Sequence, residues 1–237
     1  MNQIKIGCCG FAKGMKEYFS RFRLVEVQQT FYKPPAINTA LNWRHQAPPQ
    51  FEFTVKAWQL ITHPVSSPTY RRAGLEIPEA KAKYYGFFQP TDEVLEAWEK
   101  TRDIANALQA KIILFQCPAR FTDCPENAEK MRLFFNRLDR EAFIFVWEPR
   151  GKWNDKSVIA LCNDLGLVHC VDPLDKAPLY GRIKYFRLHG GPRYRHRYSD
   201  EELKQISEMS IGQTYILFNN LNMFEDACRL VDLVRKR

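Results

Sequence analysis

The stretch Val25-Glu26-Val27-Gln28 alternates apolar and polar residues and ends on a polar one, and six further runs of the chain end in a similar way. The other runs are Thr54-Val55-Lys56, Ile113-Leu114-Phe115-Gln116, Val146-Trp147-Glu148, Cys170-Val171-Asp172, Phe186-Arg187-Leu188-His189 and Leu217-Phe218-Asn219-Asn220. Successive side chains of a strand face opposite ways, so the polar residues of most runs share one face. The seven runs predict parallel strands whose last inward side chains surround one cavity.

Segments with helical spacing lie between the strand-like runs. Apolar residues recur three and four positions apart over residues 92–108, 126–138, 155–165, 200–209 and 223–234. Strand followed by helix, repeated to about eight units, indicates a parallel sheet covered by helices. We therefore predict the α/β class and a closed (β/α)8 TIM barrel with strands at 4–8, 24–28, 52–56, 111–116, 144–148, 167–172, 183–189 and 213–219. An open doubly wound sheet is the alternative, although no strand is followed by a dinucleotide-binding or Walker motif.

The chain length favours one domain over residues 1–237, because a TIM barrel of about 250 residues is normally a single domain. A hydrophobic fraction of 45% is enough for a substantial core. One connection, residues 62–90, is much longer than the usual two to about six residues. It contains four prolines, an Arg71-Arg72 pair and the aromatic run Tyr84-Tyr85-Gly86-Phe87-Phe88. Two interpretations stay open: a binding excursion on the carboxyl face of the barrel, or an insert packed by its aromatic residues.

Two features of the sequence bear on the compartment. No run approaches the ~18 apolar residues of a membrane helix, and the first residues lack the apolar stretch of a signal peptide. The seven cysteines show no zinc-binding spacing, so we expect mostly buried, reduced thiols, with any pairing left open. We expect a cytoplasmic protein without a membrane partner.

The formal charge of +8 favours anionic partners, although solvated lysines and arginines on outer helices would also produce it. The sharpest basic cluster is Arg193-Tyr194-Arg195-His196-Arg197-Tyr198, between the seventh strand and a Ser199-Asp200-Glu201-Glu202 capping box. Loops after strands seven and eight of TIM barrels frequently bind phosphate, and guanidinium groups suit that ligand. We predict that Arg193, Arg195 and Arg197 bind an anionic small molecule or a nucleic acid. An ordinary solvated loop is the alternative.

The polar strand ends supply the candidate site. The catalytic candidates are Glu26, Lys56, Glu148, Asp172 and His189, and the substrate-binding candidates besides the three loop arginines are Gln28, Gln116, Arg150, Arg187 and Asn219. Two carboxylates in different surroundings can divide the tasks of proton donor and acceptor. Carboxylates with His189 also suit a divalent metal by ligand type, but no spacing identifies one, so the cofactor stays open. The bland alternative is an internal ion-pair network that ties the strands together.

Six motifs of the chain resemble the domain-of-unknown-function 72 (DUF72), or YecE-like, family. They are Val25-Glu26-Val27-Gln28-Gln29-Thr30-Phe31-Tyr32, Phe53-Thr54-Val55-Lys56-Ala57, Leu114-Phe115-Gln116-Cys117-Pro118, Glu148-Pro149-Arg150-Gly151-Lys152-Trp153, Arg187-Leu188-His189-Gly190 and Tyr198-Ser199-Asp200-Glu201-Glu202-Leu203. The resemblance implies a TIM barrel with a site at these motifs, but it implies no reaction, because the biochemical function of the family is not settled.

The chain also departs from the family pattern. Gly7-Cys8-Cys9-Gly10-Phe11 stands where the family usually has Gly-Thr-Ser-Gly-Trp, and Gln28 stands where it often has Asn. Pro149-Arg150-Gly151 replaces an Arg-His pair after the fifth-strand glutamate, which removes a histidine that could serve as acid or base.

These observations favour a hydrolase or other acid/base enzyme, phosphodiesterase-like and with or without a metal, that acts on an anionic, phosphate-containing substrate. A noncatalytic nucleic-acid or nucleotide-binding protein is the alternative. Nothing in the sequence determines the oligomeric state.

Overall fold

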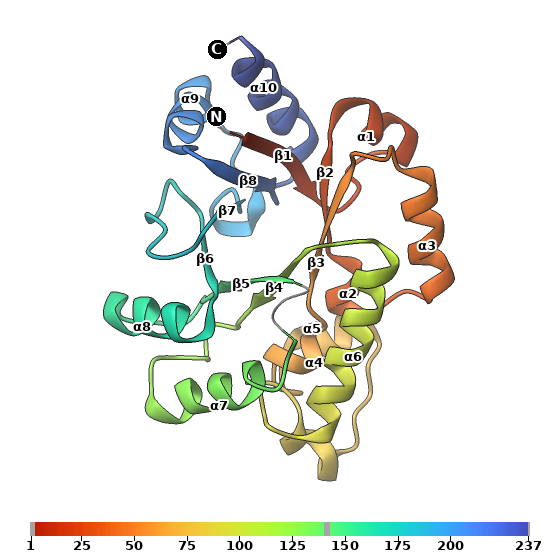
Figure 1. The fold of residues 1–237 in the computed structure, drawn as a ribbon, viewed down its shortest axis with the longest axis vertical. Coiled ribbons are helices and arrows are strands. Elements are labelled where there is room, and N and C mark those ends of the chain that lie inside the picture. The colour runs from red at the N-terminus through yellow and green to blue at the C-terminus, as the bar shows by residue number, and fades with distance from the viewer. Residues whose placement is uncertain (1–2, 140–142, 237) are drawn as a thin grey trace.

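Eight parallel strands form a closed barrel in the order of the sequence (Figure 1). The computed structural model describes residues 3–139 and 143–236. The strands are β1 (Gln3–Cys9), β2 (Leu24–Val27), β3 (Glu52–Lys56), β4 (Ile112–Gln116), β5 (Ile144–Glu148), β6 (Val168–Val171), β7 (Lys184–Leu188) and β8 (Gln213–Phe218). The predicted TIM barrel is confirmed, and the open-sheet alternative is wrong, because β1 pairs with both β2 and β8.

Several polar residues expected at strand ends lie one position beyond the strand. Gln28, Asp172, His189 and Asn219 directly follow β2, β6, β7 and β8. At these positions the chain leaves the sheet for a loop or a helix. Their side chains therefore stand at the carboxyl rim of the barrel.

Helices surround the barrel, and the apolar spacing of the sequence predicted five of them, α6 to α10. The helices are α1 (Met15–Arg21), α2 (Gln29–Tyr32), α3 (Ile37–Gln46), α4 (Gln59–Thr62), α5 (Pro68–Ala73), α6 (Asp92–Ala107), α7 (Pro125–Phe135), α8 (Asp155–Leu165), α9 (Asp200–Met209) and α10 (Met223–Arg235), with short 3-10 turns η1 (Glu79–Tyr84) and η2 (Pro192–Tyr194). The periodicity does not reveal α3, because Ala40 is its only buried residue. The capping box predicted at Ser199 and Glu202 is present.

The core has two parts because strand side chains alternate between the two faces of the sheet. The larger part lies between the strands and the helices, and a smaller apolar part fills the barrel interior. Tyr215 closes the amino end of the interior, where its hydroxyl donates to Glu52 at 2.9 Å and accepts from Lys5 at 3.2 Å. Inward positions are polar again at the carboxyl end, so an apolar layer separates the polar groups at the two ends of the barrel.

The long connection over residues 62–90 is an ordered insert that packs by aromatic contacts. Phe88 is fully buried, with its ring 5.4 Å from Phe134 and 5.5 Å from Phe121 and Phe135. The Tyr70 hydroxyl donates to the His63 carbonyl at 3.0 Å. The aromatic-packing interpretation therefore describes how the insert is held.

The cysteines are free thiols and most of them are buried, as the sequence predicts. All seven cysteines are unpaired, and five of them are buried. Within residues 3–139 and 143–236, no helix has the length and apolar character needed to cross a membrane.

We expect Phe88→Ala to lower the free energy of unfolding by about 3–5 kcal/mol, because it empties a site lined by four other aromatic rings. Urea denaturation followed by circular dichroism measures the change. Leu133→Ala on α7 is the control, since that side chain is 42% exposed and its loss should cost little. A loss below about 1 kcal/mol for Phe88→Ala would show that the insert does not depend on this anchor.

Candidate functional site

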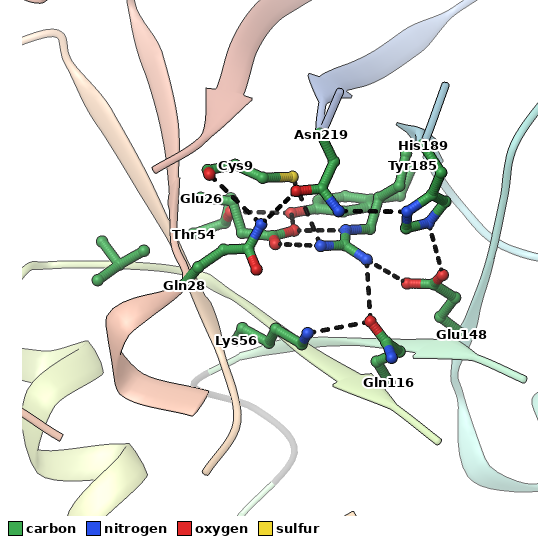
Figure 2. A network of polar contacts seen from close by, with 12 residues as sticks. Cys9, Glu26, Gln28, Thr54, Lys56, Gln116, Glu148, Tyr185, His189 and Asn219 are labelled. Carbon is green, nitrogen blue, oxygen red and sulfur yellow. Dashed lines mark hydrogen bonds and ion pairs between the residues drawn. The ribbon is translucent and has the colours of Figure 1, made fainter. Parts of the chain in front are cut away.

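A buried arginine joins two glutamates at the carboxyl end of the barrel (Figure 2). Arg187 donates from Nε and Nη2 to the two Glu26 oxygens at 3.1 and 2.8 Å, and from Nη1 to Glu148 Oε2 at 2.6 Å. Arg187 and Glu26 are 0% exposed and Glu148 is 3% exposed. The three side chains come from β7, β2 and β5, so one guanidinium links three strands across the barrel.

Residues below Arg187 complete this network. The Tyr185 hydroxyl, two positions earlier in β7, donates to Glu26 Oε2 at 2.9 Å and lies 2.8 Å from the Thr54 hydroxyl. Cys9 Sγ is 3.5 Å from Arg187 Nη2, and burial raises the pKa of the Cys9 thiol well above its usual value. The thiol of Cys9 therefore stays protonated and does not supply a nucleophile.

The charged groups of the network stabilise one another's ionised forms. Burial alone would raise the pKa of Glu148, but the charge of Arg187 and the contact with His189 hold that pKa well below its usual range. Burial alone would lower the pKa of Arg187, but the acidic groups around it hold that pKa well above its usual value. Glu148 is thus ionised at neutral pH, and both Glu26 oxygens are bound by Arg187.

Lys56 is a second buried cation, and it lacks a carboxylate partner within the described residues. Its Nζ donates to Gln116 Oε1 at 3.0 Å and lies 4.0 Å from the centre of the Phe31 ring. The same Gln116 oxygen accepts from Arg187 Nη1 at 3.2 Å. Burial, with repulsion from Arg187, lowers the pKa of Lys56 to about 8. Its remaining N–H groups have no acceptor in the described part of the chain.

Lys56 lines a cavity of about 330 Å³ at the carboxyl end of the barrel. The other lining residues are Gln28, Phe31, Tyr32, His63, Thr69, Arg72, Gln116, Tyr194, Asn219, Asn220, Leu221 and Met223. Thr69 and Arg72 come from the 62–90 insert, so this segment also forms part of the cavity wall. Burial and the nearby Lys56 lower the pKa of His63 to about 3, which keeps its imidazole neutral. None of the described lining residues is acidic, so the cavity carries positive charge.

A chain of hydrogen bonds runs from the wall of this cavity to Glu148. Gln28 Nε2 donates to Asn219 Oδ1 at 2.7 Å, Asn219 Nδ2 lies 3.2 Å from His189 Nδ1, and His189 Nε2 lies 2.9 Å from Glu148 Oε1. Since the amide oxygen of Asn219 accepts from Gln28, its amino group donates to His189 Nδ1. With Nδ1 as the acceptor, Nε2 of His189 is the nitrogen that donates to Glu148. The sequence placed these four residues at strand ends, and the structure joins them.

Arg150 and Asp172 lie on a different side of the network. With Glu148 they line a second cavity of about 270 Å³, and neither residue lines the Lys56 cavity. Arg150 Nη1 donates to Glu148 Oε1 at 3.1 Å. Asp172 accepts the backbone N–H groups of His189 and Leu174 at 3.1 and 3.2 Å, while burial raises the pKa of its carboxyl. Asp172 therefore positions the backbone of His189.

The basic loop is anchored by its backbone, with its arginine side chains in solvent. The buried Tyr198 hydroxyl accepts from Gly190 N at 2.8 Å, and Asn220 Nδ2 donates to the His196 carbonyl at 2.8 Å. Gly190 has φ +68°, and a Cβ there would lie 2.5 Å from the Asn220 Cβ, so glycine is required. Arg193, Arg195 and Arg197 are exposed and form no ion pair within the described residues. Tyr194 connects the loop to His189, with ring centres 6.2 Å apart, and also lines the cavity.

The donor set does not fit a divalent metal. Within residues 3–139 and 143–236, no three His, Cys, Asp or Glu side chains are grouped so that they could hold an ion. The physical reason is the Arg187 guanidinium, which lies between Glu26 and Glu148 and takes the charge that a metal would need.

A family sequence model, "Protein of unknown function DUF72", matches residues 9–236 of this chain. This chain belongs to that family. No curated protein matches it. A DUF72 family protein from Enterococcus faecalis has a similar solved structure with a TM-score of 0.73 and 19% identity, covering 99% of this chain and 98% of the other.

Two further solved structures show the same fold. A DUF72 family protein from Thermotoga maritima has a TM-score of 0.66 and 21% identity, covering 98% of this chain and 99% of the other. Endonuclease IV from Thermus thermophilus has a TM-score of 0.50 and 11% identity, covering 100% of this chain and 98% of the other. At these identities the likeness concerns the barrel fold.

Sequence reasoning missed several residues of the site. Tyr185 shares the inward face of β7 with Arg187 and is found by counting back two positions. His63, Thr69 and Arg72 lie in or beside short helices of the insert, where no strand period applies. Only tertiary packing brings that segment to the cavity.

We expect Glu148→Gln to lower the free energy of unfolding by about 2–4 kcal/mol at pH 7, because it leaves excess positive charge buried. The pKa of Glu148 is depressed in the folded state. Its stabilisation is therefore present above the unfolded value of about 4.3 and is lost as the pH falls toward the folded pKa. Urea titrations at pH 7, 4 and 3 should show the difference from wild type shrinking in acid. Exposed Glu201→Gln is the control, and a difference independent of pH would contradict this account.

We expect Lys56→Met to raise the free energy of unfolding by about 1–3 kcal/mol at pH 7, because folding lowers the pKa of Lys56 and so disfavours its charged form. The gain should fall as the pH rises through 8 and vanish above about 10.5, where the lysine is neutral in both states. Urea titrations at pH 7 and 9.5 measure it. A destabilised variant at pH 7 would show that Lys56 serves the fold.

Proposed function

We propose that this chain is an acid/base enzyme that acts on a small, phosphate-containing substrate bound in the Lys56 cavity. The observation that carries the proposal is the Lys56 ammonium, which is 5% exposed, lines the cavity and has no carboxylate partner in the described chain. A buried charge without a partner is costly, and folds retain one mainly where a ligand or a reaction uses it.

An anion fits the electrostatics of this cavity. Lys56 and Arg72 both line it, and no described lining residue is acidic. The basic loop follows β7, which is a frequent place for phosphate contacts in TIM barrels. Its exposed arginines add positive potential that would draw an anion toward the opening.

The acid/base task falls to Lys56 and to the chain from Gln28 to His189. Glu26 and Glu148, both catalytic candidates by sequence, are occupied by Arg187, so we assign them the role of positioning residues. Asp172 likewise positions His189 through its backbone. Lys56, with a pKa of about 8, can both hold and release a proton near neutral pH. Hydrolysis of a phosphate-containing compound is one reaction that this arrangement would serve.

Ligand titration tests the proposal. Isothermal calorimetry with inorganic phosphate and sugar phosphates, each beside the unphosphorylated sugar, should show binding of the phosphorylated compounds only. Lys56→Met and Arg72→Ala should each weaken binding at least about tenfold, since each removes a charge-assisted contact. Arg71→Ala is the matched control, because Arg71 is exposed beside Arg72 and does not line this cavity. Equal affinities for all four proteins would contradict the proposal.

Nucleic-acid binding is the second candidate function, and the unpaired arginines of the basic loop favour it. Endonuclease IV, a fold neighbour, bears a name that points to nucleic acid, which adds support at the level of the fold. Tyr198 is buried and cannot stack on a base, whereas Tyr194 is exposed. Any stacking would therefore fall to Tyr194.

We expect a protein with Arg193, Arg195 and Arg197 replaced by alanine to bind a labelled single-stranded oligonucleotide more weakly and with a flatter dependence on salt. For three lost phosphate contacts, the slope of log K against log salt should fall by about 2. Fluorescence anisotropy at several salt concentrations measures this. The melting temperature should stay near that of wild type, because the three side chains are exposed. Unchanged slopes would assign the loop to the solvated surface.

A further inference from the structure

We propose that Lys56 forms a Schiff base with an aldehyde or ketone carbon of the substrate, which makes the substrate a phosphorylated carbonyl compound. This inference rests on the proposed function and names the substrate class of the same cavity. It starts from the placement of the amine: Nζ lines the cavity, has Phe31 on one side and is held by a single acceptor, Gln116 Oε1.

Burial and the nearby Arg187 make the neutral, nucleophilic form of Lys56 more populated than that of an ordinary lysine, although Glu26 and Glu148 act in the opposite direction. A second cation, Arg187, donates to the same oxygen of Gln116, so two positive groups share one acceptor. Burial beside another cation is a known way to activate a lysine toward carbonyl carbon. With a pKa of about 8, about a tenth of Lys56 is unprotonated at pH 7, which exceeds the fraction of an ordinary lysine by about two orders of magnitude.

The cavity also contains a hydrogen-bond donor for the carbonyl oxygen and an acceptor for the water that is released. Gln116 Nε2 and Gln28 Oε1 form no hydrogen bond within the described residues, and both side chains line the cavity. Gln116 can donate to the carbonyl oxygen, while Gln28 can accept from the water that leaves. Arg72, on the wall, is placed to bind the phosphate of the same molecule.

The step balances without any further reactant. Nζ attacks the carbonyl carbon, so that a C–N bond forms and the C=O bond becomes C–OH. Loss of that oxygen as water leaves C=N. Of the three protons on the Lys56 ammonium, two leave with the carbonyl oxygen as water and one stays on the iminium nitrogen, so charge is conserved and nothing is oxidised or reduced.

Reductive trapping tests the inference. The full chain is incubated at pH 7 with glycolaldehyde phosphate and sodium cyanoborohydride, then digested, and the modified lysines are located by mass spectrometry. Glycolaldehyde without phosphate is run beside it. We expect Lys56 to be modified at least tenfold faster than the exposed Lys204, and inorganic phosphate to slow modification by the phosphorylated probe. Lys56→Met should abolish the fast phase, whereas Lys204→Arg should leave it unchanged.

The outcomes separate the inference from the proposed function. Phosphate-sensitive modification at Lys56 supports both. Binding of sugar phosphates in the calorimeter without preferential modification of Lys56 overturns the Schiff base and keeps the proposed function. Fast modification by both probes, unaffected by phosphate, keeps the reactive amine and overturns the phosphate-containing substrate. If Lys56 reacts no faster than Lys204 and no phosphate binds, both fail.

Discussion

The guanidinium of Arg187 is the contact on which the carboxyl end of this barrel depends. It is completely buried and forms ion pairs with both Glu26 and Glu148, so that opposite charges from three strands stabilise one another in a place where none of them alone could be tolerated. Tyr185 and Thr54 extend the same network downward, toward the apolar filling of the barrel. The polar rim is therefore a rigid layer in which each strand end has an assigned position.

This constraint decides where chemistry can occur. Because Arg187 is paired with both glutamates, the ends of β2 and β5 support the site and do not present a free carboxylate to it. The buried charge that has no carboxylate in contact, among the residues that the structure describes, is that of Lys56, which shares the acceptor Gln116 with Arg187 and lines the cavity. The ion-pair layer thus leaves the Lys56 amine without a described carboxylate in contact, next to the hydrogen-bonded chain of Gln28, Asn219 and His189. Such a division between a supporting layer and one perturbed group is typical of sites built for a ligand.

The insert over residues 62–90 combines aromatic packing with a place in the cavity wall. Its aromatic residues, with Phe88 at the centre, pack against α7 and β4. Thr69 and Arg72, from α5 in the same insert, line the cavity. The insert is therefore anchored by buried aromatic side chains and also contributes side chains to the cavity wall.

Residue patterns alone determined the barrel and the identity of the strand-end residues. Period-two alternation is a local property of extended chain, so Glu26, Arg187 and Glu148 could be assigned to an inward face before any contact was known. Which of those residues pair, which face a cavity and which only hold a backbone was decided by the tertiary structure. Distances between strands depend on the closure of the barrel and on the register of its pairs, and neither is encoded in any single run. For that reason Asp172 was a catalytic candidate in the sequence, while in the folded chain it binds the backbone of His189.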